Sequence, residues 1–258
     1  MLDKLKNQEL SIFEIMGMAF SVFKENIQSF FAIALIIGIP INFIFAFVSS
    51  KFEAVTMSVD LVNMLKDAQL IENFISTGKF KDVMLCETVL LILNGLFYPL
   101  ITLAVAHMTE DILEGRKADI KKSILAAFEK GPVLIPAAIL YQIIIWGGFM
   151  LFVIPALVFT VWFYFYKYAI ILDNETPVES LRLSRNISRG NFARVAVSLL
   201  ALYILEYALA GVFSNIFMSF GINVSMEFIS SCIKNLIDTF FWCASAMLYL
   251  NLKYVKSK

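Results

Sequence analysis

The sequence has little of what metalloproteins and soluble enzymes use. Of its 258 residues, one is histidine, three are cysteines and 16% are charged. One histidine cannot form a metal site alone. Cys86, Cys232 and Cys243 have neither the close spacing of a zinc site nor the even number of a disulfide framework. We therefore expect no metal and no cofactor, and packed thiols at all three positions, with Cys86 and Cys232 as the pair to check.

Catalytic motifs are also missing from the sequence. It has no Gly-x-Ser-x-Gly turn, no Gly-x-x-x-x-Gly-Lys phosphate loop and no His-Glu-x-x-His pair. We expect no catalytic residues and a non-enzymatic function. The 21 basic and 21 acidic residues cancel, so nucleic acid is not an expected partner. His107, the one histidine, is predicted to lie at the membrane interface.

Apolar residues are abundant. They make up 60% of the chain, and the mean hydropathy is +0.79, which is typical of proteins in lipid. A bilayer core of ~30 Å needs ~20 apolar helical residues. The sequence therefore predicts an all-α polytopic membrane protein with six transmembrane helices in three hairpins, in a single membrane domain over residues 1–258. The predicted spans are about 27–49, 88–108, 132–152, 155–172, 194–218 and 228–250, with an outer segment at 50–87.

Two further features describe how the chain threads the membrane. Gly147, Gly148 and Pro155 predict a tight turn near Val153 to Pro155, between the third and fourth spans. Sixteen of the 21 lysines and arginines flank one side of the predicted spans, and basic residues stay in the cytoplasm. We expect an inner-membrane, multi-pass protein with both termini cytoplasmic and no cleaved leader.

Each predicted hairpin follows a short helix with its own start signal. Ser11 with Glu14 forms a capping-box pattern, Asp119 opens residues 119–130, and Thr176 with Pro177 opens residues 176–190. The apolar spacing within these segments predicts cytoplasmic amphipathic helices at the interface. We infer three copies of one unit, each an interfacial helix followed by two spans.

Residues 152–195 resemble a known family. The resemblance is to the membrane domain ahead of some bacterial glycerophosphodiester phosphodiesterases and its stand-alone uncharacterised relatives. Residues 10–40 and 247–258 are similar to it as well. The motif positions present here are Ile154, Pro155, Asp173, Ser180, Leu181, Ser184 and Gly190. The resemblance implies the membrane fold and no catalytic residue, because catalysis in the fused enzymes belongs to a separate soluble domain.

Several polar residues fall inside predicted spans. An ionisable group at mid-bilayer costs roughly 2.5–3.5 kcal/mol on insertion scales. Glu206, Lys234 and Asp238 belong to one predicted hairpin, with Gln142 and Tyr141 at comparable depth, so we predict an intramembrane polar cluster. Either it binds a proton, cation or amine on a transport path, or Lys234 neutralises the acids and holds the hairpin together.

Four arginines precede the fifth span. They are predicted to contact anionic lipid headgroups, with plain cytoplasmic anchoring as the alternative, and are Arg182, Arg185, Arg189 and Arg194. Expected partners are membrane lipids, anionic ones included, and a membrane protein or a second copy forming a homodimer. The favoured function is a lipid-contacting scaffold or accessory subunit. The competing class is a small transporter or an immunity-like self-protection protein.

Overall fold

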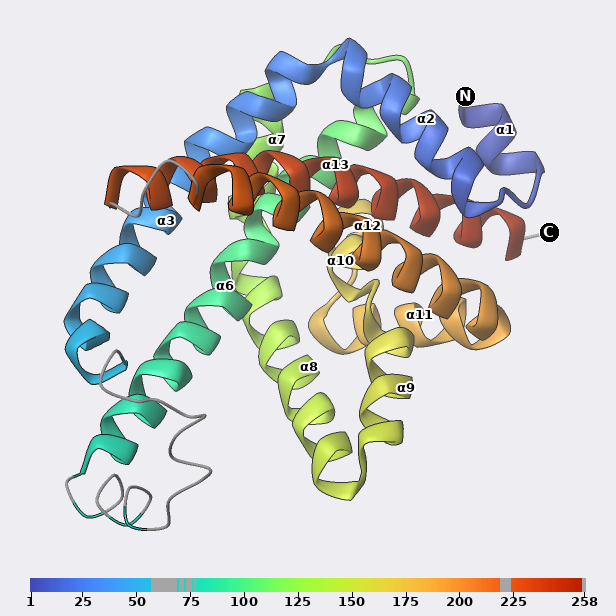
Figure 1. Ribbon diagram of the computed structural model, residues 1–258. Coiled ribbons are helices and arrows are strands. Elements are labelled where there is room, and N and C mark those ends of the chain that lie inside the picture. Colours follow the sequence, from blue (N-terminus) through green and yellow to red (C-terminus); the bar gives the residue numbers. More distant parts are fainter. Residues whose placement is uncertain (57–68, 70–71, 73–75, 77, 219–223, 257–258) are drawn as a thin grey trace.

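The computed structural model describes residues 1–56, 69, 72, 76, 78–218 and 224–256 (Figure 1). These residues form helices and no strand, which confirms the all-α class for this part of the chain. Residues 57–68, 70–71, 73–75 and 77 of the predicted outer segment 50–87 lie outside the described residues. The helices are α1 (Leu2–Asn7), α2 (Ile12–Glu25), α3 (Ile27–Thr56), α6 (Lys79–Leu113), α7 (Ile120–Glu129), α8 (Gly131–Leu151), α9 (Val153–Phe163), α10 (Tyr166–Leu172), α11 (Pro177–Gly190), α12 (Phe192–Met218) and α13 (Val224–Lys256).

Three helices each precede a pair of helices that pack against one another: α2 before α3 and α6, α7 before α8 and α9, and α11 before α12 and α13. Their starts follow the predicted signals. The Ser11 hydroxyl accepts from the Glu14 N–H at 3.3 Å, and the Glu14 carboxylate accepts from the Ser11 N–H at 2.9 Å. Asp119 caps α7, and α11 begins at Pro177. The capping box and these helix starts are therefore confirmed.

Within the described residues, five helical segments are long and apolar enough to cross a membrane. They overlap the first five predicted spans and are Ile27–Phe45, Phe80–Leu113, Gly131–Leu151, Val153–Leu172 and Phe192–Phe213. Many of their apolar side chains are exposed, such as Ile143 at 62% and Leu200 at 60%. A contiguous exposed apolar surface of this kind is suited to lipid rather than water. The sixth predicted span falls in α13, which is not among the five.

Helix α13 is the central helix of the described bundle. It packs against α1, α2, α3, α6, α11 and α12, and in Figure 1 it passes between α2 and α12. Every residue from Cys243 to Leu252 is buried. Because so much of α13 packs against protein, it can carry buried polar side chains such as those of Asn235, Asp238 and Asn251. Its composition is therefore less apolar than that of the lipid-facing helices.

The α8–α9 turn lies next to the predicted position. Phe152, in extended backbone, separates the two helices, and its N–H donates to the Gly148 carbonyl at 3.0 Å. The helices approach closely here, because a Cβ on Gly148 would lie 2.9 Å from both the Ala156 Cα and Phe159 Cδ2. The predicted tight turn is confirmed, one residue before Val153, and glycine permits the close approach.

The predicted span 155–172 is one stretch by composition but two helices in the structure. The helix is interrupted between Phe163, where α9 ends, and Tyr166, where α10 begins. Ser184 of α11 bridges the break: its hydroxyl donates to the Trp162 carbonyl at 2.8 Å and accepts from the Phe165 N–H at 3.0 Å. A break inside a membrane needs such substitutes for the missing helical hydrogen bonds.

The two chain ends lie together (Figure 1). The buried Asn251 amide of α13 donates to the Leu5 and Gln8 carbonyls at 2.8 Å each, and its oxygen accepts from the Leu10 N–H at 3.2 Å. The Lys6 ammonium lies 5.1 Å from the centre of the Tyr254 ring. These contacts hold the α1–α2 connection against the end of α13.

The three thiols are free. Cys86 and Cys243 are buried and Cys232 is half-buried. The prediction of packed thiols is confirmed, and Cys86 and Cys232 are not joined by a disulfide.

Candidate functional site

The predicted polar cluster is divided between two places. Lys234 and Asp238, one turn apart on α13, form an ion pair at 2.7 Å. The Asp238 carboxyl is almost fully buried, whereas half of the Lys234 side chain is exposed. Glu206 of α12 is half-buried and interacts electrostatically with both. Tyr141 and Gln142 of α8 line a different space, described next.

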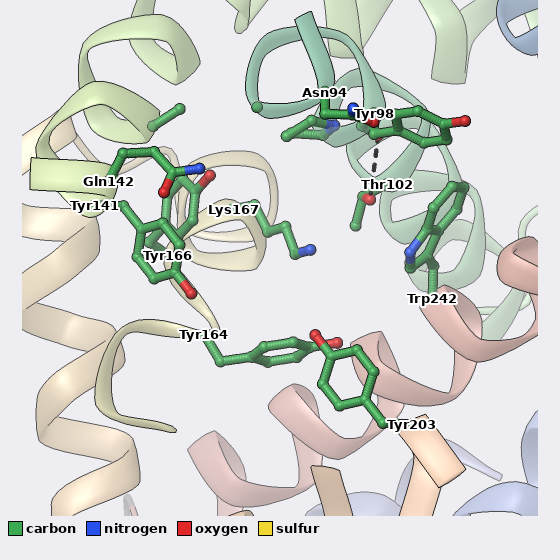
Figure 2. A pocket seen from close by; sticks show the side chains of 13 residues that line it. Asn94, Tyr98, Thr102, Tyr141, Gln142, Tyr164, Tyr166, Lys167, Tyr203 and Trp242 are labelled. Carbon is green, nitrogen blue, oxygen red and sulfur yellow. Dashed lines mark hydrogen bonds between the residues drawn. The ribbon is translucent and has the colours of Figure 1, made fainter. Parts of the chain in front are cut away.

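That space is a cavity of about 230 Å³ enclosed by five segments of the bundle. It lies where α6, α8, the α9–α10 break, α12 and α13 meet, and we call it the Lys167 cavity. Figure 2 shows the Lys167 side chain entering it from the break, with its ammonium toward the centre. The lining residues are Asn94, Gly95, Tyr98, Pro99, Thr102, Ala138, Tyr141, Gln142, Tyr164, Tyr166, Lys167, Tyr203 and Trp242.

The lining combines aromatic rings with hydrogen-bond donors. Lys167 Nζ lies 5.1 Å from the centre of the Tyr164 ring and 5.8 Å from that of Tyr168, within the range of cation–π contacts. Tyr141 stacks on Tyr166 with the ring centres 5.1 Å apart. The Tyr164 and Ser245 hydroxyls form a hydrogen bond with their oxygens 3.1 Å apart. These contacts hold the walls of the cavity in place.

Three donors in the cavity are not used by the surrounding protein. Among the described residues, the Lys167 ammonium, the Gln142 amide and the Trp242 indole N–H take part in no hydrogen bond, and Lys167 forms no direct ion pair. No acidic side chain lines the cavity in the part of the chain that the structure describes. Glu206 interacts with Lys167 electrostatically from outside the lining.

The backbone explains why a lysine can occupy this position. In a continuous helix the predicted span would place Lys167 near its cytoplasmic end, and the sequence suggested only a flanking basic residue. The break before Tyr166 redirects the chain so that Tyr164, Tyr166 and Lys167 face one space. Irregular backbone at membrane depth is tolerated where protein buries it or where it lines a cavity. In the sequence, the one feature that could have indicated this position of Lys167 is that the lysine stands among several tyrosines.

The four predicted headgroup contacts are not equivalent. Arg182, Arg185 and Arg189 are exposed and share one face of α11 with the exposed Val178. Arg182 pairs with Glu179 at 3.0 Å, and Arg185 lies 5.0 Å from the centre of the Trp162 ring. These side chains reach the surface where a headgroup could contact them.

Arg194 is placed differently from the prediction. Its Nη2 donates to the Leu10 carbonyl at 2.7 Å and to the Asn251 side chain at 2.6 Å. Nη1 is buried and without a hydrogen-bond partner among the described residues. The physical reason is that α12 begins beside the end of α13, so a residue in its first turn faces the protein. Arg194 links both ends of the chain.

A second charged cluster joins α6 to α7. The buried Asp111 carboxylate accepts from Arg116 Nε at 2.7 Å and from Lys122 Nζ at 3.0 Å. The hydrogen bond to Asp111 raises the pKa of the Arg116 guanidinium. His107 Nδ1 lies 3.2 Å from the Ser123 hydroxyl, so the histidine expected at the interface packs between two helices. We interpret this cluster as a structural link.

Fold and cavity together define the class of protein: a helical bundle that has, among the described residues, five apolar helices of membrane-crossing length and a polar cavity. Residues 68–252 match a family described as a domain of unknown function, DUF7847. The match covers more than half of the chain, so the protein belongs to that family. No curated protein and no solved structure matches the chain.

Proposed function

We propose that the protein is a non-enzymatic, multi-pass inner-membrane protein with six crossings, whose cytoplasmic helices contact anionic lipid and which serves as a scaffold or accessory subunit. The observation that carries this proposal is the exposed face of α11. Val178, Arg182, Arg185 and Arg189 are spaced by four, three and four residues, which puts one apolar and three basic side chains on one side of the helix.

The other two short helices support the same role. Helix α2 buries Ile15, Ala19 and Val22 while Phe13 and Phe20 are 81% and 58% exposed. Leu125 and Phe128 of α7 are also exposed. A helix that packs one face on the protein and exposes large apolar side chains on another offers an apolar surface suited to the membrane interface.

The contacts of the chain ends support six crossings rather than five. Asn251 bonds to the carbonyls of Leu5 and Gln8, so the chain before α3 and the end of α13 share one side. An even number of crossings is then required. Five helices qualify by composition, and α13 supplies the sixth, consistent with the predicted span 228–250. The resemblance to the phosphodiesterase-linked membrane domain remains a prediction.

Fluorescence of Trp162 tests the lipid contact, because Arg185 lies over that ring. A protein carrying Trp146→Phe and Trp242→Phe keeps Trp162 as its single tryptophan. In nanodiscs, brominated phosphatidylglycerol should quench it more than brominated phosphatidylcholine. Arg182→Gln with Arg185→Gln should remove the difference. Lys117→Gln with Lys121→Gln, which removes two exposed basic residues just before and within α7, should leave it unchanged. Equal quenching by both lipids before any arginine is changed would count against the proposal.

The alternative, a small transporter or self-protection protein, is favoured by one observation, the Lys167 cavity beside a broken helix. Discontinuous helices accompany substrate sites in many transporters. Deleting the gene and measuring uptake, together with sensitivity to membrane-active peptides, separates the two classes. A scaffold predicts that neither changes when Lys167 alone is replaced, and a transporter predicts that one of them does.

A further inference from the structure

An apolar groove lies next to the Lys167 cavity. This groove has a volume of about 630 Å³ and lies between α6 and α8; we call it the α6–α8 groove. Gly95, Ala138 and Gln142 line both spaces, so the two adjoin along these residues. The remaining groove residues are apolar and are Leu91, Ile92, Ile139, Ile143, Trp146, Gly147 and Met150. Most of their side chains are exposed on a surface suited to lipid.

We propose that the Lys167 cavity and the α6–α8 groove form one binding site for an amphiphile with a single alkyl chain and an anionic oxygen headgroup. The headgroup lies in the cavity and the chain lies in the groove. Both volumes are of the order of known ligand pockets, ~300–1,000 Å³. The groove faces the membrane, so the ligand enters sideways from the lipid.

Charge and hydrogen bonding select the headgroup. The cavity offers a cation and two neutral N–H donors, from Lys167, Gln142 and Trp242, and no lining carboxylate among the described residues. A carboxylate or phosphate monoester can pair with the Lys167 ammonium and accept hydrogen bonds from neutral N–H donors, whereas an ammonium headgroup would face Lys167 without a counter-charge. A charged side chain inside a membrane is costly, and binding an anion is one way to offset that cost.

Glu206 lowers the affinity of the site for an anionic ligand. It interacts electrostatically with Lys167 but does not line the cavity. Asp238 is already paired with Lys234, which leaves Glu206 as the acid that competes with the ligand for Lys167. Removing the Lys167 charge should therefore weaken binding, and removing the Glu206 charge should strengthen it. A purely apolar groove would respond to neither change.

The geometry of the junction adds a test that is independent of charge. A Cβ on Gly95 would lie 3.6 Å from Gln142 Nε2, at ordinary contact distance. A leucine at this position would extend into the space that joins cavity and groove. Gly95→Leu should thus block the ligand while leaving every charge in place.

Quenching of Trp146, which lines the groove, measures binding directly. Trp162→Phe removes the tryptophan that lies outside this site and keeps Trp242, one of the proposed headgroup donors, in the cavity. The full chain is placed in nanodiscs of zwitterionic lipid. Three chain-brominated probes are titrated: a fatty acid, a lysophosphatidic acid and a neutral monoacylglycerol. We expect saturable quenching by an anionic probe, and the probe that saturates at the lower concentration shows whether the headgroup is a carboxylate or a phosphate.

The variants decide the outcome. Lys167→Met should weaken binding of the anionic probe about 10- to 100-fold, Lys167→Arg should retain it, and Glu206→Gln should tighten it roughly 2- to 5-fold. Equal affinity for the neutral probe, or quenching that is linear and the same in Lys167→Met, would overturn the proposal. If Lys167→Met does not fold, unchanged affinity in both Glu206→Gln and Gly95→Leu overturns it instead.

Discussion

At the scale of single residues, hydrogen bonds to side chains replace those that the backbone loses at helix ends and breaks. Ser184 and Ser188 lie one turn apart on α11, and both are fully buried. The Ser184 hydroxyl bridges Trp162 and Phe165, whereas the Ser188 hydroxyl is without a partner among the described residues. The two serines are thus a matched pair that differs in hydrogen bonding.

Replacing each serine by alanine should change the free energy of unfolding by different amounts. Ser184→Ala leaves a buried carbonyl and a buried N–H unsatisfied, which should lower the free energy of unfolding by ~1–3 kcal/mol. Ser188→Ala removes an unpaired buried hydroxyl and should change it by less than ~0.5 kcal/mol or raise it. Denaturant titration in detergent measures both. Equal losses would show that volume, not the bridge, matters at Ser184.

Asn251 is a second residue whose hydrogen bonds were not predicted from the sequence. Asn251→Ala removes the acceptor of Leu10 and Arg194 and the donor to two carbonyls, so it should destabilise the protein by ~1–3 kcal/mol and expose the α1–α2 connection to proteases. Asn215→Ala is the control, because the exposed Asn215 bonds only within its own helix. Asn251→Ala with unchanged protease cleavage before α2 would contradict this role.

Sequence alone identified residues of the candidate site only in part. Tyr141 and Gln142 were recognised as polar groups at membrane depth, and both line the cavity. Lys167 was not recognised as a site residue, because the direction of its side chain follows from the interruption between α9 and α10. The hydrogen bonds across that interruption come from Ser184, a residue of a different helix. Contacts between residues distant in the chain leave no local pattern.

At the scale of helices, local signals predicted boundaries well. The change from polar to apolar residues at Asn26 and Lys130 coincides with the start of α3 and of α8, and the capping box sets the start of α2. Helix α13 was predicted from the same kind of pattern. Protein buries its residues 243–252 and the side chains of Asn235 and Asp238, however, which allows polar residues that a lipid-facing helix would exclude.

Two adjacent glycines test how α8 and α9 pack. A Cβ on Gly148 would approach the Ala156 Cα to 2.9 Å, whereas one on Gly147 would meet nothing within 4 Å. Gly148→Ala should therefore push the helices apart and lower the free energy of unfolding by ~1–3 kcal/mol. Gly147→Ala should be neutral or stabilise by ~0.5–1 kcal/mol, because alanine favours a helix over glycine. Thermal unfolding of both variants decides whether the contact is real.

At the scale of the whole molecule, the arrangement of the chain ends makes a prediction about topology. Because α1 packs against α13 and Asn251 bonds to the first residues of the chain, the N-terminus and the end of α13 must share a side. Helix α13 therefore has to cross the membrane if α3, α6, α8, α9–α10 and α12 all do. Any odd number of crossings would separate Asn251 from its partners by the thickness of the bilayer.

Labelling of single cysteines tests this requirement. With the three native cysteines replaced, a membrane-impermeant maleimide should reach Asp3→Cys and Arg189→Cys only from the cytoplasmic side, and Lys81→Cys and Ile229→Cys only from the outer side; all four positions are exposed. Ile229 is the decisive position, because it lies at the start of α13. Labelling of Asp3→Cys and Ile229→Cys from one side would mean that α13 does not cross. The cavity that α13 helps to enclose with Trp242 would then lie at the membrane surface, and a ligand could reach it from water rather than from lipid.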